Sequence, residues 1–204
     1  KIDFREFMTE GIPCLEASQT GDGHKSYLCV IPGTVLADLY DRFGSRLLER
    51  NVRSFLGIRG TKSVNSGIRS TILTQPSLFF AFNNGIAVTA STVEVSRSGN
   101  GLHILCADDM QIVNGGQTTA SLTTAKRKDK AELKDIFVQM KLSVIEPERA
   151  DELIPQISRS ANSQNKVNDA DFFSNHPFHV RIETHSRHLW APAIAGAQHE
   201  THWF

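Results

Sequence analysis

Cysteine is scarce in this sequence, and long apolar runs are absent. The chain of 204 residues has three cysteines, Cys14, Cys29 and Cys106, which stand far apart and form no CxxC pair. An odd number of isolated cysteines excludes a disulfide framework and is typical of a reducing compartment. No stretch approaches eighteen consecutive apolar residues, and the N-terminus lacks the build of a signal peptide. We therefore expect a cytoplasmic protein that has no membrane segment.

No charge of one sign predominates either. Lys plus Arg and Asp plus Glu both total 22, so the formal net charge is zero. A neutral chain argues against non-specific coating of nucleic acid, and any basic surface must be local. Hydrophobic residues make up 40% of the sequence, which is enough to bury the core of one domain.

Familiar catalytic patterns are also missing. The sequence has no HExxH motif, no Walker-type lysine after its glycine pair, and no Ser-His-Asp or Cys-His arrangement in a recognisable context. Asp108 and Asp109 fit a bend in a strand or, alternatively, a catalytic Mg²⁺ site. Six histidines near the end of the sequence form three H-x-x-H pairs. Such pairs lie on helix surfaces more often than they bind a metal ion. We predict no metal ligands among them: His176, His179, His185, His188, His199 and His202.

The spacing of apolar residues predicts an α+β or α/β fold with a mixed sheet, a β-hairpin and flanking helices. Period-two alternation indicates strands, and three-to-four spacing indicates helices, with Gly44 and Pro177 as interruptions. The expected strands are Ser26–Pro32, Ile86–Ser96, Leu102–Val113 and Ile136–Ile145, the middle two forming a hairpin through Ser98–Gly101. The expected helices are Thr34–Arg50, Ser63–Thr74, Glu148–Ser160 and Asp169–Leu189, besides one that follows the glycine pair.

This order of elements predicts one core domain over residues 25–167. An N-terminal extension over residues 1–24 precedes it, and a helical segment over residues 168–204 follows it. The chain opens with Lys and stops at two large aromatic residues, so we expect a fragment of a longer protein whose C-terminal part is cut short.

The most informative segment is the run IVNGGQTTASLTTA, in which a predicted strand passes through two glycines into a predicted helix. Residues without Cβ permit a positive φ and let backbone N–H groups approach a ligand. The first turn of a helix offers unpaired amides and the positive end of the dipole, which favour an anion. A plain strand-to-helix turn capped by threonine explains the same residues. The candidate phosphate-binding residues are Asn114, Gly115, Gly116, Gln117, Thr118 and Thr119.

Asparagine and glutamine recur where the predicted elements begin or end. Each fits ordinary capping and Asx-turn chemistry. Together with an arginine and a lysine they can also line one pocket around the glycine turn, because amides bind base edges and phosphates and arginine binds phosphate through two bonds. The basic run Lys126–Lys128 is interpreted as a solvated helix end, with a phosphate-contacting patch as the alternative. The further candidates are Asn51, Arg53, Lys62, Asn65, Asn83, Asn84, Asn162, Gln164 and Asn165.

Five segments in this order resemble the AIPR family, the abortive-infection phage-resistance proteins. The segments are NVRSFLG, VNSGIRSTI, PSLFFAFNNGI, QIVNGGQTTASL and SANSQNKV. The resemblance covers the chain from about Ser26 to its end and implies a bacterial antiphage defence component. A more distant likeness is to the ParB/sulfiredoxin-like and DGQHR-type domains, whose Gly-containing turn lies at nucleotide phosphates. Those domains usually continue from the turn into His-Arg or Arg-Arg, whereas this chain has Thr118 and Thr119, which weakens the implied binding of a nucleotide triphosphate.

Two functional hypotheses follow. In the first, the protein is an abortive-infection module that binds a nucleotide or a nucleic-acid phosphate at the NGGQTT turn, without consuming it. In the second, it is a metal-dependent nuclease or nucleotide-processing effector, which would require Mg²⁺ and would use Asp108 or Asp109 together with the late histidines. The first is favoured because the sequence supplies neutral polar groups and a phosphate-ready turn but no acid, base or nucleophile set. A scaffold that binds other defence proteins is a third alternative.

Overall fold

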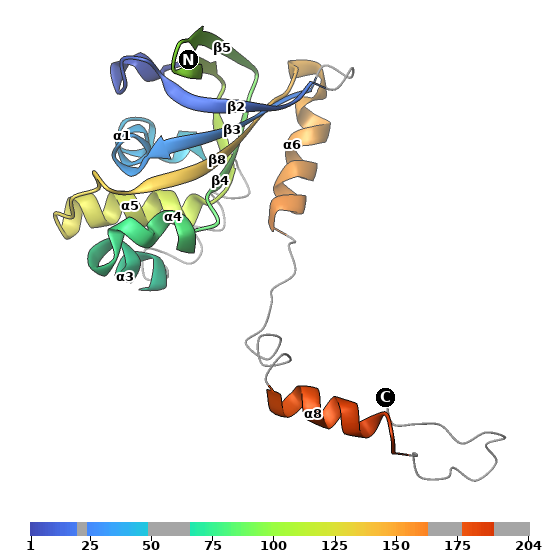
Figure 1. The fold of residues 1–204 in the computed structure, drawn as a ribbon. Coiled ribbons are helices and arrows are strands. Elements are labelled where there is room, and N and C mark those ends of the chain that lie inside the picture. The colour runs from blue at the N-terminus through green and yellow to red at the C-terminus, as the bar shows by residue number, and fades with distance from the viewer. Residues whose placement is uncertain (20–23, 49–65, 163–176, 190–204) are drawn as a thin grey trace. The chain divides into compact units, whose positions relative to one another are not determined.

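The computed structural model describes residues 1–19, 24–48, 66–162 and 177–189. The chain divides into two units, Lys1–Ser163 and Gln164–Phe204. In the second unit the described element is the helix α8, Pro177–Ser186. All other elements named below belong to the first unit, which is drawn with its labels in Figure 1.

The first unit is built on a curled mixed sheet of eight strands, in agreement with the predicted fold class. The strand order is β1-β6-β2-β3-β8-β4-β7, and β5 pairs with β6 beside this path. The pair β4–β8 is parallel, and the other pairs are antiparallel. The strands are β1 (Ile2–Asp3), β2 (Ile12–Gln19), β3 (Lys25–Pro32), β4 (Ile86–Ala90), β5 (Thr92–Ser98), β6 (Gly101–Asp108), β7 (Gln111–Asn114) and β8 (Phe137–Val144).

Six α-helices are described in the two units together, with three short 3-10 segments. The predicted helix after the first strand is confirmed, and it ends where Gly44 takes a φ of +58°. The helix after the glycine pair runs to Lys128, so the basic run is helical. The helices are α1 (Gly33–Phe43), α3 (Ser66–Thr74), α4 (Phe79–Phe82), α5 (Gly116–Lys128), α6 (Pro147–Asn162) and α8; the 3-10 segments are Phe4–Glu6, Gly44–Leu47 and Pro76–Leu78.

The predicted hairpin is confirmed, but each of its two long strands is divided by a bend. One arm breaks at Ser91 into β4 and β5, and the other breaks at Asp109 and Met110 into β6 and β7. Asp109 has a φ of +50°, which is uncommon for a residue other than glycine. The Ser91 hydroxyl donates to Asp109 Oδ2 at 2.8 Å, and the Ser91 N–H donates to the Asp108 carbonyl at 3.0 Å. The two arms therefore bend at the same level.

This bend makes the sheet curl. On the side of the bend that leads to the hairpin turn, β6 pairs with β2. On the other side of the bend, β4 pairs with β8. The hairpin thus joins both sides of the β2-β3-β8 layer. The strands β1 and β2 fall within residues 1–24, to which the sequence analysis assigns no element.

The two faces of the β4–β7 pair carry different helices. Side chains alternate across a strand, so Ile86, Val88 and Ile112 point into the core that α1 and α5 complete. The opposite face meets α6, which packs on β7 and β4. Ser158 of α6 is buried, and its hydroxyl donates to the Val113 carbonyl at 3.2 Å.

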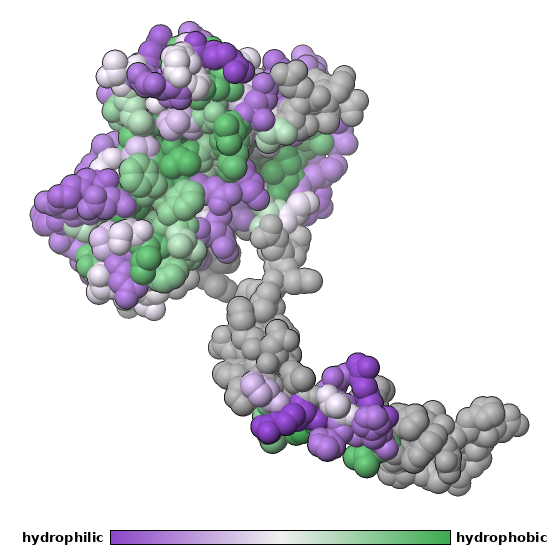
Figure 2. All heavy atoms as spheres, in the orientation of Figure 1, coloured by the Kyte–Doolittle hydropathy of each residue, from purple (hydrophilic) through white to green (hydrophobic). Residues whose placement is uncertain are grey.

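Part of the outer face of the sheet is apolar and exposed. Figure 2 shows apolar residues gathered over β2, β3 and β8. The large apolar side chains exposed on these strands are Leu15, Leu28, Val30 and Phe137. Within the described residues, no helix has both the length and the apolar character that a membrane span requires.

Candidate functional site

The glycine turn joins β7 to α5 as the sequence predicts. Gly115 is the residue before the helix and has a φ of +88°, in the left-handed region that favours glycine. A Cβ at this position would lie 2.5 Å from Ile86 Cγ2 and 2.8 Å from the Gly85 carbonyl oxygen. The turn therefore packs directly on the chain that enters β4, and this contact alone requires glycine at position 115.

Asn83 and Thr118 bring a second segment to the first turn of α5. The Asn83 amide donates to Thr118 Oγ1 at 3.2 Å, and the Thr118 hydroxyl lies 3.3 Å from Asn83 Oδ1. Asn83 Oδ1 also accepts from the Gly85 N–H at 2.9 Å, which is an Asx-type turn. Asn83 thus has the local turn role that single asparagines commonly have, and it also contacts the helix start.

Asn114 ties the end of α6 to the same turn. Its side-chain oxygen accepts from the Gly115 N–H at 2.6 Å, and its side-chain amide donates to the Ala161 carbonyl at 2.6 Å. Asn162, another predicted site residue, is the last residue of α6 and follows Ala161 directly. The structure therefore brings the end of β7, the start of α5 and the end of α6 together.

The remaining predicted residues of the turn differ in exposure. Thr119 is fully buried, and its hydroxyl donates to the Gly115 carbonyl at 3.3 Å within the helix. Gly116 is also buried, Gln117 is half-buried, and Asn84 is exposed. Among the described residues of this turn, Thr118, Gln117 and the backbone amides of the first helical turn are the groups that could bind an anion.

Six predicted site residues lie outside the described residues: Asn51, Arg53, Lys62, Asn65, Gln164 and Asn165. The described residues on either side of the first four can be placed. Leu48 forms a parallel bridge to Ile112 on β7, and α3 begins at Ser66 and packs on α5. The described residues that flank positions 49–65 on both sides therefore lie next to the elements that form the turn.

A small cavity links the start of α3 to Asn83. It has a volume of about 290 Å³. Besides Asn83, it is lined by Gly67, Ile68, Thr71, Phe79 and Phe82. This cavity thus lies between α3 and α4, and Asn83 belongs both to its lining and to the contact with Thr118.

Charged groups lie at the other end of α5. Lys126 pairs with Asp38, and Arg127 Nε lies 2.7 Å from Asp41 Oδ1, both acids being on α1. Arg69 of α3 donates through Nε to Asp129 Oδ2 at 2.9 Å, and this hydrogen bond lowers the pKa of Asp129. Thirteen helical residues separate the two ends by roughly 18 Å. The described basic run is thus a helix end paired with α1, far from the glycine turn.

The acidic pair occupies the bend of the hairpin, as one of the two sequence interpretations has it. Asp108 Oδ2 accepts from the Thr92 hydroxyl at 2.8 Å, while Asp109 accepts from Ser91. In the described part of the chain, no group of three or more His, Cys, Asp or Glu side chains could hold a metal ion. Of the histidine pairs, His185 and His188 are described, at the end of α8 and just after it.

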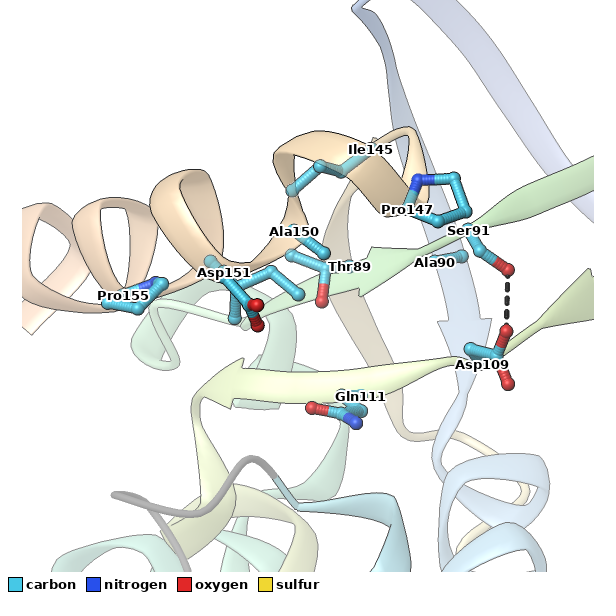
Figure 3. A pocket seen from close by; sticks show the side chains of 11 residues that line it. Thr89, Ala90, Ser91, Asp109, Gln111, Ile145, Pro147, Ala150, Asp151 and Pro155 are labelled. Atoms are coloured by element: carbon cyan, nitrogen blue, oxygen red, sulfur yellow. Dashed lines mark hydrogen bonds between the residues drawn. The ribbon is translucent and has the colours of Figure 1, made fainter.

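A larger cavity, which sequence reasoning did not find, lies under the first half of α6. Its volume is about 450 Å³ (Figure 3). Its polar lining residues come from three places in the sequence and stand in ordinary local contexts, so no motif marks them. The one local signal is Pro155, a proline inside a helix. The polar lining residues are Thr89, Ser91, Asp109, Gln111 and Asp151.

Comparison with known proteins gives one match. The family model described as AIPR protein matches residues 48–204, which is most of the chain. No curated protein and no solved structure matches the chain. The matched part contains the glycine turn, α3 and α6, and the family indicates antiphage defence by abortive infection. The chain belongs to the AIPR family.

Proposed function

We propose that this antiphage defence domain binds the phosphate of a nucleotide or of a nucleic acid at the turn between β7 and α5. The observation that carries the proposal is the meeting of separate chain segments at this turn. Asn83 contacts Thr118, Asn114 holds the end of α6, and Leu48 bridges Ile112. Each of these segments leads into or contains residues that suit phosphate recognition.

The chemistry available at the helix start supports an anionic ligand. The N–H groups at positions 116 to 118 have no carbonyl partner four residues back within the helix, and the dipole of α5 places its positive end there. The Thr118 hydroxyl can exchange its contact with Asn83 for one to a phosphate oxygen. Gln117 is half-buried on the same turn and offers an amide donor.

Positive charge for the phosphate would come from segment 49–65. Among the described residues of the turn there is no Lys or Arg. Arg53 lies five residues beyond Leu48, which is bridged to β7, and Lys62 lies four residues before the start of α3. Few residues therefore separate Arg53 and Lys62 from described residues that lie beside β7 and α5, and we expect both side chains to approach the turn. Arginine would bind the phosphate through two hydrogen bonds.

The experiment is thermal unfolding of the full-length protein with ribonucleoside and deoxyribonucleoside triphosphates and with short DNA and RNA, each with and without Mg²⁺. A ligand at a hundred times its Kd should stabilise the fold by about 2.7 kcal/mol, which raises the Tm by several degrees. The nucleic acid is examined afterwards for cleavage. Recovery of an intact, stabilising ligand is the expected result.

Two variants test whether the ligand binds at the turn. Thr118→Val should weaken binding about fivefold, and Arg53→Ala about tenfold or more, because each removes a hydrogen bond to the ligand. Thr123→Val is the control for the first, since its buried hydroxyl bonds only within α5, to the Thr119 carbonyl. Arg97→Ala on the exposed strand β5 is the control for the second, since it removes the same charge.

Unchanged affinity in both Thr118→Val and Arg53→Ala would contradict the proposal. Mg²⁺-dependent cleavage that Asp109→Asn abolishes would replace it with the nuclease hypothesis.

A further inference from the structure

The cavity under α6 is separate from the glycine turn. It lies at the beginning of β7, where Gln111 is, whereas Gly115 follows the end of this strand. The two positions are four residues apart, or roughly 13 Å along a strand. Apolar walls make up much of the lining: Ala90, Ile145, Pro147, Ala150, Ile154 and Pro155.

The polar groups of this cavity are mainly hydrogen-bond acceptors. Asp109 comes from the bend of the hairpin and Asp151 from α6, and no Lys, Arg or His is among the described residues that line the cavity. The Ser91 hydroxyl donates to Asp109 and keeps its lone pairs for another donor. In the view of Figure 3, Thr89 and Gln111 lie between the two carboxylates. Two negative charges without a cation beside them disfavour a phosphate ligand.

Thr89 is an independent indication that this cavity binds a ligand. Its side chain is 1% exposed, and Oγ1 is buried without a hydrogen-bond partner. Figure 3 shows the hydroxyl directed into the space between α6 and Gln111. Buried polar groups in native proteins are nearly always hydrogen-bonded, and an exception calls for a ligand or an ordered water.

Pro155 adds one more acceptor. A proline has no N–H, so the Asp151 carbonyl lacks its usual helical donor four residues later. Both residues line the cavity. The first half of α6 therefore brings the Asp151 carboxylate to the cavity, beside a backbone carbonyl that lacks its usual helical donor.

We propose that this cavity binds a small aliphatic diamine or polyamine. An ammonium group has three donors and no acceptor, which suits a lining of carboxylates, hydroxyls and a carbonyl. Two ammonium groups would pair with Asp109 and Asp151, and the methylene chain between them would lie against the isoleucine, proline and alanine side chains. A volume of about 450 Å³ is within the range of small-molecule sites and far exceeds the needs of a single metal ion.

The test is calorimetric titration of the full-length protein with 1,4-diaminobutane and with spermidine, and with 1,4-butanediol as a neutral analogue of the diamine. The diol should bind at least tenfold more weakly, since it carries no charge. Asp151→Asn and Asp109→Asn should each weaken diamine binding about tenfold. Asparagine tolerates the positive φ at position 109, so the second variant leaves the bend intact. Thr89→Val should weaken binding about threefold by removing the unpaired hydroxyl.

Glu148→Gln is the matched control. Glu148 is exposed on α6, one turn before Asp151, and does not line the cavity. It should change diamine affinity less than twofold. Equal weakening in Glu148→Gln and Asp151→Asn would show general attraction to the acidic surface and would overturn the proposal. Absence of diamine binding, or binding of Mg²⁺ alone to Asp109 and Asp151 in place of the diamine, would overturn it as well. None of these outcomes decides phosphate binding at the glycine turn, which is tested with other ligands and with Thr118→Val and Arg53→Ala.

Discussion

The two ends of β7 differ in how their polar groups are satisfied. At the end that enters α5, Asn83 bonds to Thr118, Asn114 bonds to the end of α6, and packing requires glycine at position 115. At the beginning of the strand, the Thr89 hydroxyl is buried without a partner beside two carboxylates. Internal hydrogen bonds thus hold the first region together, while the second keeps unused hydrogen-bonding capacity. The difference teaches that a glycine-rich segment can be the place where several elements are joined. A cavity that no sequence motif indicates can have more room for a ligand.

The largest expected effect is at the junction. Gly115→Ala combines a backbone strain at φ +88° with a Cβ only 2.5 Å from Ile86 Cγ2. We expect it to lower the free energy of unfolding by roughly 3–5 kcal/mol, from strain and overpacking together. Gly101→Ala is the control, because Gly101 has a φ of +114° and no atom within 4 Å of the place that a Cβ would take, so it incurs the strain alone. Urea denaturation measures both, and equal losses would mean that packing on β4 does not matter.

The link between the two regions can be broken at Ser158. Its buried hydroxyl joins the middle of α6 to the Val113 carbonyl. Ser158→Ala leaves that carbonyl without this donor and should lower the free energy of unfolding by about 2 kcal/mol. Gln156→Ala, at an exposed position of the same helix, should stay within about 0.5 kcal/mol of the wild type. A similar effect of both variants in urea denaturation would contradict the role of Ser158.

The smallest expected effects test the comparison most directly. The same substitution, threonine to valine, should change the free energy of unfolding in opposite directions at the two ends of β7. Thr118→Val removes a hydroxyl that bonds to Asn83 and should lower the free energy of unfolding by about 1 kcal/mol. Thr89→Val removes a hydroxyl that has no partner and should raise it by up to about 1 kcal/mol. Urea denaturation without ligand measures both changes. If both variants are destabilised alike, the two regions do not differ in the way described.

Local sequence patterns predicted much of this fold. A short apolar run located β3, alternation located β8, and the glycine pair located the start of α5. The bend at Asp109 was one of the two interpretations of the acidic pair, but the matching break at Ser91 was not predicted, although the apolar positions change there from Ile86 and Val88 to Val93 and Val95. The parallel pairing of β4 with β8 depends on residues more than fifty positions apart, which local propensity does not encode. The likeness to the ParB/sulfiredoxin-like and DGQHR-type domains stays a prediction.

The candidate site was predicted in part. Glycine, asparagine and threonine at a strand-to-helix junction are visible in the sequence, and the structure brings Asn83, Asn114 and Thr118 together. Thr89, Gln111 and Asp151 were missed because they meet only through the packing of α6 on the sheet. Each looks unremarkable among its own neighbours in the chain.

The pairing of β8 has a consequence for any shortened form of the protein. The family match begins at residue 48, but β8 pairs along its full length with β3, which ends at Pro32. A chain that started at residue 48 would leave β8 as a long open edge strand and would strip α1 from the core. Open apolar edges recruit other chains, so such a chain should aggregate. The smallest piece that folds is therefore larger than the piece in which the family can be recognised.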